Sequence, residues 1–86
     1  MELYSEIKKS FADIEKRFGY DEFAEFKNAP VSDLCLYHFG LGTWIRNNLI
    51  YSKESILYNL FLKNGIKNED EMSSIIIRLF HYHASV

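Results

Sequence analysis

The chain has 86 residues, a formal net charge of −2 and a single cysteine, Cys35. This length predicts one domain spanning residues 1–86, and one cysteine excludes an internal disulfide. Because there is no excess of basic residues, direct binding to nucleic acid phosphates is not expected. No stretch approaches the roughly 20 apolar residues of a membrane span, and the N-terminal sequence lacks the apolar run of a secretory signal. We therefore expect a cytoplasmic protein that makes no contact with a membrane.

Aromatic residues are abundant, with seven Phe, six Tyr and one Trp. Each can bury roughly 150–250 Å². Together they can build one core without help from a metal or a disulfide. They also exceed what so short a chain readily hides, so we expect one or two aromatic side chains at a surface used for contact.

Two helices are predicted in the first third of the chain. The first spans 3–18, and Gly19 stands where a glycine C-cap belongs. Its apolar stripe recurs at spacings of three and four residues and consists of Leu3, Ile7, Phe11, Ile14 and Phe18. The second spans 21–28, with Asp21 as its N-cap. Pro30 then disfavours helical geometry at the residue before it.

A long central helix is predicted over 33–50, with Ser32 as its cap. Its apolar residues cover so much of its girth that other helices should enclose it. The residues expected on one side or widening this apolar surface are Leu34, Leu36, Tyr37, Phe39, Leu41, Trp44, Ile45, Asn48 and Leu49.

Two further helices are predicted after the central one. The first spans 53–64, with Ser52 as its cap and Gly65 as its terminator. The second spans 69–83, where Asn68 and an acid three residues later resemble a capping box. Their expected core residues are Ile56, Leu57, Leu60 and Phe61 in the first, and Met72, Ile75, Ile76, Leu79, Phe80 and His83 in the second. The fold class is therefore predicted to be all-α, a small bundle of four to five helices.

The stretch "YHFGLGTWIRNN", residues 37–48, holds two glycines within the predicted central helix. It lacks the glycine spacing and the Gly-Lys-Ser/Thr ending of a phosphate-binding loop. Gly40 and Gly42 lie on different faces of a helix, and each costs about 1 kcal/mol relative to alanine. Two explanations stay open. Either another segment packs closely over the backbone, which we favour, or a short unwound turn exposes backbone groups to a partner.

The end of the same stretch also has two interpretations. Arg46 near a helix C-terminus suits the helix dipole, and Asn47 and Asn48 tolerate the left-handed conformation of a cap. Alternatively, the planar guanidinium of Arg46 binds a carboxylate or phosphate, with His38 and the two asparagines beside it. The structural interpretation is favoured.

Metal binding and catalysis are not expected. Cys35 and His38 have a spacing that can bind metal, but the remaining ligands would have to be His81 and His83, which point in roughly opposite directions on a helix. No local signature pairs Cys35 with a base as a nucleophile. We therefore expect no cofactor, no metal and no enzymatic activity.

Acidic residues concentrate in the first third of the chain. Residues 1–33 carry eight acids, Glu2, Glu6, Asp13, Glu15, Asp21, Glu22, Glu25 and Asp33, and five bases, Lys8, Lys9, Lys16, Arg17 and Lys27. This end attracts a basic partner if the chain binds one, although a solvated face explains the same pattern. The partner contact is predicted at Asp21, Glu22 and Glu25, with exposed aromatics such as Tyr4, Tyr20 and Phe23.

The blocks "HFGLGTWIRNN", "NEDEMSSIII" and "FHYH" resemble a family of small bacterial helical proteins with an "HFGLGxxIRN…DMSSII" pattern. The resemblance covers residues 37–83, and Glu71 departs from it because the pattern has Asp directly before Met. The matching residues are His38, Phe39, Gly40, Leu41, Gly42, Ile45, Arg46, Asn47, Gly65, Ile66, Asp70, Met72, Ser73, Ser74, Ile75, Ile76, Tyr82 and His83.

Some members of that family resemble immunity proteins of contact-dependent inhibition systems, which bind and block a delivered toxin domain. The resemblance implies that this chain is an immunity protein that occludes a cognate toxin, most simply a nuclease with a basic groove. No catalysis by the chain itself is expected. The alternative hypothesis is a small-ligand or nucleic-acid binding domain that uses His38, Arg46, Asn47 and Asn48.

Overall fold

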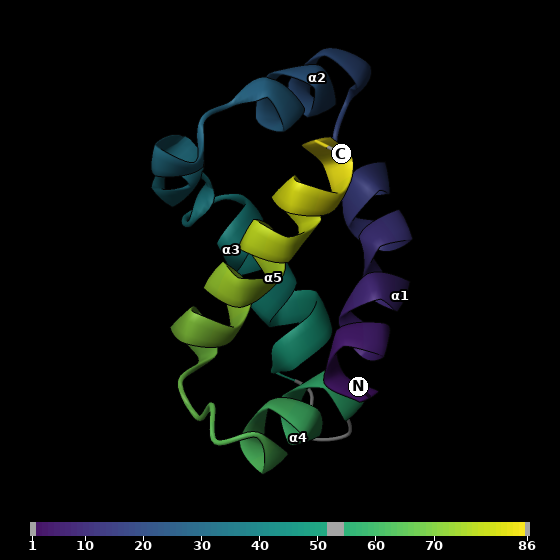
Figure 1. Cartoon of the computed structure of the whole chain (residues 1–86), viewed down its shortest axis with the longest axis vertical. Helices are drawn as coiled ribbons and strands as arrows, with labels where there is room; N and C mark the ends of the chain where they lie inside the picture. Colours follow the sequence, from purple (N-terminus) through teal and green to yellow (C-terminus); the bar gives the residue numbers. More distant parts are fainter. Residues whose placement is uncertain (1, 52–54, 86) are drawn as a thin grey trace.

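The computed structural model describes residues 2–51 and 55–85 and contains only helices in these ranges (Figure 1). The predicted all-α class is therefore confirmed for this part of the chain. The count differs from the expected four to five helices, because the described residues form five α-helices, one 3-10 segment and one π-helical segment. They are α1 (Glu2–Arg17), α2 (Tyr20–Asn28), the 3-10 segment η1 (Val31–Tyr37), α3 (Leu41–Ile45), the π segment η2 (Arg46–Ile50), α4 (Ile56–Lys63) and α5 (Glu69–Ser85).

The C-terminal helix α5 is the centre of the fold and packs against α1, α2, η1, α3 and η2. In Figure 1 it crosses the middle of the molecule between α1 and α3, while α2 lies over its C-terminal end. Helix α4 closes the opposite end against α1 and η2. No helix in the described ranges has both the length and the apolar character needed to cross a bilayer.

One hydrophobic core joins these helices, and the part of it next to α2 is aromatic. The ring of Phe26 from α2 packs 5.5 Å from Phe80 and 5.1 Å from Phe18. Phe11 of α1 approaches Phe80 to 5.5 Å from the other side. The buried apolar residues are Ile7, Phe11, Ile14, Phe26, Leu34, Leu41, Ile45, Ile50, Leu57, Phe61, Met72, Ile76, Ile77 and Phe80.

Helix α1 follows its predicted stripe, with Ile7, Phe11 and Ile14 buried. The predicted caps around the first loop are wrong. Gly19 has an extended backbone with φ −74°, so it is not a left-handed C-cap, and it occupies the N-cap position of α2. Helix α2 consequently begins at Tyr20, one residue earlier than predicted, and Asp21 lies inside its first turn rather than capping it.

The predicted continuous helix over 33–50 is wrong. Pro30 occupies the N-cap position of η1, so Ser32 does not cap this segment, and a turn at residues 38–40 separates η1 from α3. The tighter 3-10 repeat of three keeps Leu34 and Tyr37 on the inner face. Leu36 of η1 is 73% exposed, and Phe39, in the turn after η1, is 84% exposed, although both were expected to join the apolar surface. Asn48 is also exposed.

The last two helices keep most of their predicted signals. Gly65 ends α4 with φ +84°, a left-handed conformation that glycine adopts without strain. Asn68 caps α5, because its side-chain oxygen accepts the backbone N–H of Glu71 at 3.1 Å. The cap predicted at Ser52 falls outside the described residues. Ser55 caps α4 instead, since its hydroxyl accepts the N–H of Tyr58 at 3.1 Å.

Two side chains of these helices differ from the prediction. Ile56, expected to face the core, is exposed at the first position of α4. His83 is exposed as well, although its ring lies 4.9 Å from that of Phe11. Both lie near a helix end, where the stripe that faces the core gives way to solvent. The remaining predicted core residues of α4 and α5 are buried or half-buried: Leu57, Leu60, Phe61, Met72, Ile75, Ile76, Leu79 and Phe80.

Candidate functional site

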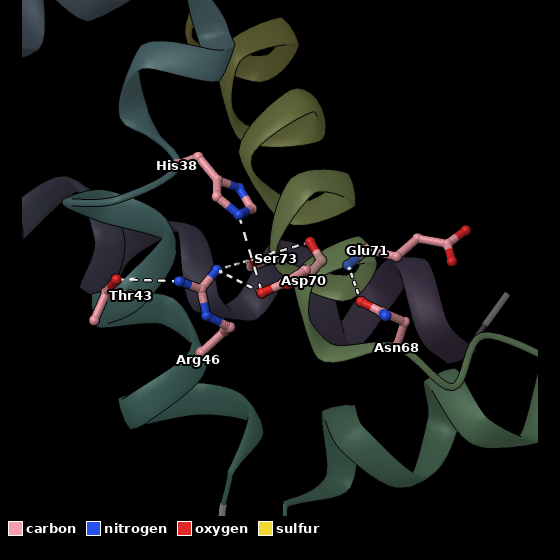
Figure 2. A network of polar contacts seen from close by, with 7 residues as sticks. All are labelled: His38, Thr43, Arg46, Asn68, Asp70, Glu71 and Ser73. Atoms are coloured by element: carbon pink, nitrogen blue, oxygen red, sulfur yellow. Dashed lines mark hydrogen bonds and ion pairs between the residues drawn. The ribbon is translucent and has the colours of Figure 1, made fainter.

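The guanidinium of Arg46 is the centre of a polar cluster between α3 and the first turns of α5 (Figure 2). Its side chain is only 10% exposed. The Nη1 atom donates to the hydroxyl of Ser73 at 2.9 Å, and Nη2 donates to the hydroxyl of Thr43 at 3.1 Å. Nη1 also lies 3.5 Å from the carboxylate of Asp70. Arg46 therefore links η2 to α3 and α5.

Asp70 connects the cluster to His38. The carboxylate oxygen that faces Arg46 lies 4.0 Å from Nε2 of His38, and 67% of the Asp70 side chain is open to solvent. The Ser73 hydroxyl in turn donates to the backbone carbonyl of Asp70 at 2.9 Å. A carboxylate in the first turn of α5 also suits the positive end of the helix dipole. Arg46, Ser73 and Asp70 therefore hold the start of α5 against α3.

Among the described residues, no buried side-chain nitrogen or oxygen lacks a hydrogen-bond partner. This matters because a vacant donor aimed into a cavity is what a ligand site would offer. Both terminal nitrogens of Arg46 donate to partners within the chain, Nη1 to Ser73 and Nη2 to Thr43. The arrangement is that of a structural clamp, and a ligand would have to displace these bonds to bind there.

Gly42 belongs to this clamp, whereas Gly40 does not. A Cβ atom on Gly42 would lie 3.1 Å from Nη1 of Arg46 and 3.7 Å from Nδ1 of His38. A Cβ atom on Gly40 would meet nothing within 4 Å. Close packing therefore accounts for Gly42. Gly40 lies in the turn before α3, where the predicted long helix is interrupted.

We expect Gly42→Val to lower the free energy of unfolding by about 2 kcal/mol, because overpacking at a tight site costs about 1–3 kcal/mol. The branched side chain would push the guanidinium of Arg46 away from Ser73. Chemical denaturation monitored by circular dichroism measures this change. The matched control is Gly40→Val, which adds the same side chain where a Cβ atom meets nothing within 4 Å and should cost distinctly less. Equal effects at the two glycines would contradict the assignment of close packing to Gly42.

The residues predicted as a ligand site are only partly brought together. His38 and Arg46 both approach Asp70. Asn47 and Asn48 are exposed, and the amide of Asn48 donates to the carbonyl oxygen of Trp44 at 2.9 Å. The sequence analysis missed the clamp partners Thr43, Asp70 and Ser73. Thr43 carried a usable signal, since it lies three residues before Arg46 and therefore on the same helix face.

The remaining candidates for chemistry lie apart. Cys35 is exposed, and its thiol lies 3.6 Å from the carbonyl oxygen of Ser32. His81 is buried, and its Nε2 atom lies 2.8 Å from the carbonyl oxygen of Ala29, which ties α5 to the end of α2. No group of three or more potential metal ligands occurs in residues 2–51 and 55–85.

The acidic residues predicted to bind a partner lie on the outer side of α2. Asp21, Glu22 and Glu25 are exposed, and Tyr20 is 90% exposed. Among the described residues, no cation lies within 4.0 Å of these three carboxylates. We call these four residues the α2 face. Phe23 differs from its expected exposure, because it is half-buried with its ring 5.9 Å from Phe18 and 6.0 Å from Phe80.

The α2 face continues into a hollow of about 620 Å³ between α2 and η1, to which Glu25, Asp33, Leu36 and Tyr37 contribute. Burial raises the pKa of the Tyr37 phenol, and the negative charges of Glu25 and Asp33 raise it further. Because both carboxylates act on the same phenol, they concentrate negative potential at this hollow. We call it the acidic notch.

The chain was compared with known protein families. Residues 5–84 match the family described as a domain of unknown function, DUF6794. The chain belongs to this family. No curated protein and no solved structure matches the chain. The DUF6794 match assigns no activity, so the resemblance to immunity proteins stays a prediction.

Proposed function

We propose that the chain is a protein-binding inhibitor that covers a basic surface of its partner with the α2 face. The observation that supports this proposal best is the set of three exposed carboxylates without a cation nearby in the described residues, next to the exposed ring of Tyr20. Unpaired charges of one sign speed diffusional encounter with a complementary partner. A tyrosine beside them adds a rigid, amphipathic contact of the kind enriched in protein interfaces.

The partner class follows from the charge. A nuclease domain binds a polyanion and therefore presents a basic groove, which the α2 face and the acidic notch would fill. Inhibition is by occlusion, because the carboxylates take the positions of nucleic acid phosphates and the chain performs no reaction. The resemblance to immunity proteins makes the toxin of a contact-dependent inhibition system the specific partner proposed, and the cytoplasm the site of action.

We expect simultaneous reversal of Asp21, Glu22 and Glu25 to lysine to slow association with the toxin domain encoded by the adjacent gene by at least about tenfold at low salt. Stopped-flow or surface-based kinetics gives the association rate, and a nuclease assay gives the inhibition. The matched control reverses Glu2, Asp13 and Glu15, three exposed acids of α1, and so changes the net charge by the same amount. The control should associate nearly as fast as the unaltered chain. Equal slowing by both sets, or by neither, would reject the α2 face.

The alternative, a small-ligand or nucleic-acid site at Arg46, has less support. Its guanidinium bonds to Ser73 and Thr43 within the chain, and Asn48 bonds to the carbonyl oxygen of Trp44. A phosphate at Arg46 would also have to compete with the Asp70 carboxylate, which lies 3.5 Å from Nη1.

A further inference from the structure

The 3-10 segment η1 separates two hollows on one side of the molecule. Its repeat of three residues places Ser32, Cys35 and His38 toward α5, and Asp33 and Leu36 toward α2. The hollow on the α5 side has a volume of about 540 Å³, and its far wall is formed by Ile77 and Arg78. We call it the α5 groove. The hollow on the α2 side is the acidic notch.

Beside these hollows, η1 and the turn that follows it expose three large apolar side chains. Val31, Leu36 and Phe39 are 62%, 73% and 84% exposed, and we call these three residues the η1 ridge. Leu36 borders the acidic notch, and Phe39 borders the α5 groove. Single exposed apolar residues are ordinary, but three within nine positions beside two hollows form the kind of patch that marks an interaction site.

The two sides of the ridge carry opposite charges. Asp33 and Glu25 line the acidic notch, whereas Arg78 lines the α5 groove. All three side chains are exposed, and in the described ranges none of them lies within 4.0 Å of an opposite charge. The ridge is therefore an apolar strip with an acidic flank and a basic flank.

We propose that two copies of this chain pair through the η1 ridge about a two-fold axis. The two-fold axis runs along the ridge, within the plane between the two copies. A rotation of 180° about this axis places the acidic flank of one copy opposite the basic flank of the other. The acidic notch of one copy then faces Arg78 of the other, and the contact forms twice. Leu36 and Phe39 of one copy pack against the ridge and groove of its partner. The surface is complementary to itself in both charge and apolar character, which is the requirement for an isologous dimer.

This dimer does not rest on the proposed inhibitor function, but it covers the acidic notch that the inhibitor proposal also uses, so dimerisation and toxin binding would compete. It is tested with the purified chain alone. Sedimentation equilibrium between roughly 1 μM and 1 mM should show a monomer–dimer equilibrium. Changing both Leu36 and Phe39 to serine should raise the dissociation constant at least tenfold. These side chains are exposed, so the melting temperature of the monomer should change little. A control that changes Ile56, an exposed apolar residue on α4, to serine should leave the equilibrium unchanged.

Charge exchange tests the orientation of the two copies. Asp33→Arg and Arg78→Asp should each yield a monomer, because each brings like charges together twice. An equimolar mixture of the two variants should recover the dimer, since both contacts then join opposite charges. Failure of the mixture to pair would overturn the two-fold arrangement. A chain that stays monomeric up to about 1 mM, or a dimer indifferent to the Leu36 and Phe39 changes, would overturn the proposal as a whole.

Discussion

Replacing Arg46 with alanine is expected to lower the free energy of unfolding by about 2–3 kcal/mol and the melting temperature by about 10–20 °C. The substitution removes two charge-assisted hydrogen bonds, to Ser73 and Thr43, and leaves a void where the side chain was almost fully buried. Asp70 loses its nearest cation but stays hydrated, because most of its side chain is open to solvent. The expected loss therefore stays below that of breaking a fully buried ion pair.

Two further variants show whether the geometry of Arg46 or only its charge is required. Arg46→Lys should recover little of the lost stability, because a single ammonium cannot reproduce the two donors of the planar guanidinium. Arg17→Ala is the control for the loss of an arginine that is not buried, because Arg17 is exposed on α1. It should change the free energy of unfolding by less than about 0.5 kcal/mol. Thermal and denaturant unfolding measure all three.

The same experiment separates the two hypotheses for the "RNN" segment. A ligand-binding arginine would leave the melting temperature of the alanine variant nearly unchanged and remove only binding. If Arg46 is a clamp, the alanine variant should have a lower melting temperature, and the first turns of α5 should be less ordered in it. An Arg46→Ala variant as stable as the unaltered chain would therefore reject the clamp and make a ligand screen the next step.

Two helix ends could be predicted from local signals in the sequence, although the caps predicted at Gly19, Asp21 and Ser32 were wrong. Gly65 and Asn68 act within one turn of their own position, so their roles as terminator and cap could be predicted from neighbouring residues alone. The clamp could not be predicted in this way. Ser73 lies 27 positions after Arg46, and nothing in the sequence pairs the two before α5 packs on η2.

The break in the central helix was missed for a different reason. Leu34 and Tyr37 lie three residues apart, a spacing that fits the inner face of a 3-10 segment as well as that of an α-helix. The spacing alone does not decide between the two. In the structure Tyr37 packs edge-on against Phe26 of α2, with ring centroids 4.8 Å apart, a contact that the sequence does not reveal. The η1 ridge was therefore not foreseen, and Leu36 and Phe39 were expected to widen the apolar surface of a central helix.

We expect Phe26→Ala to lower the free energy of unfolding by about 3–5 kcal/mol, the largest loss of any single change considered. Phe26 is fully buried and packs against aromatic rings from α5, from η1 and from the loop after α1. Its partners are Phe80 of α5, Phe18 in the loop after α1, and Tyr37 of η1, which it contacts edge-on. A chain of this size has a total stability of only about 4–13 kcal/mol, so the variant should be partly unfolded at 37 °C.

Removal of the Phe26 ring should also destabilise α2 and η1, which carry the two proposed surfaces, more than the other helices. The reason is that Phe26 is the buried residue through which α2 and η1 pack together. His81, whose ring packs edge-on against Phe26 at 5.3 Å, would lose support for its bond to Ala29 at the end of α2. Hydrogen exchange should therefore show earlier opening of α2 and η1 than of α4. The control is Tyr20→Ala, an exposed aromatic residue on the same helix, which should leave both stability and exchange nearly unchanged. Uniform opening across all helices would mean that α2 and η1 do not form a separable unit held by Phe26.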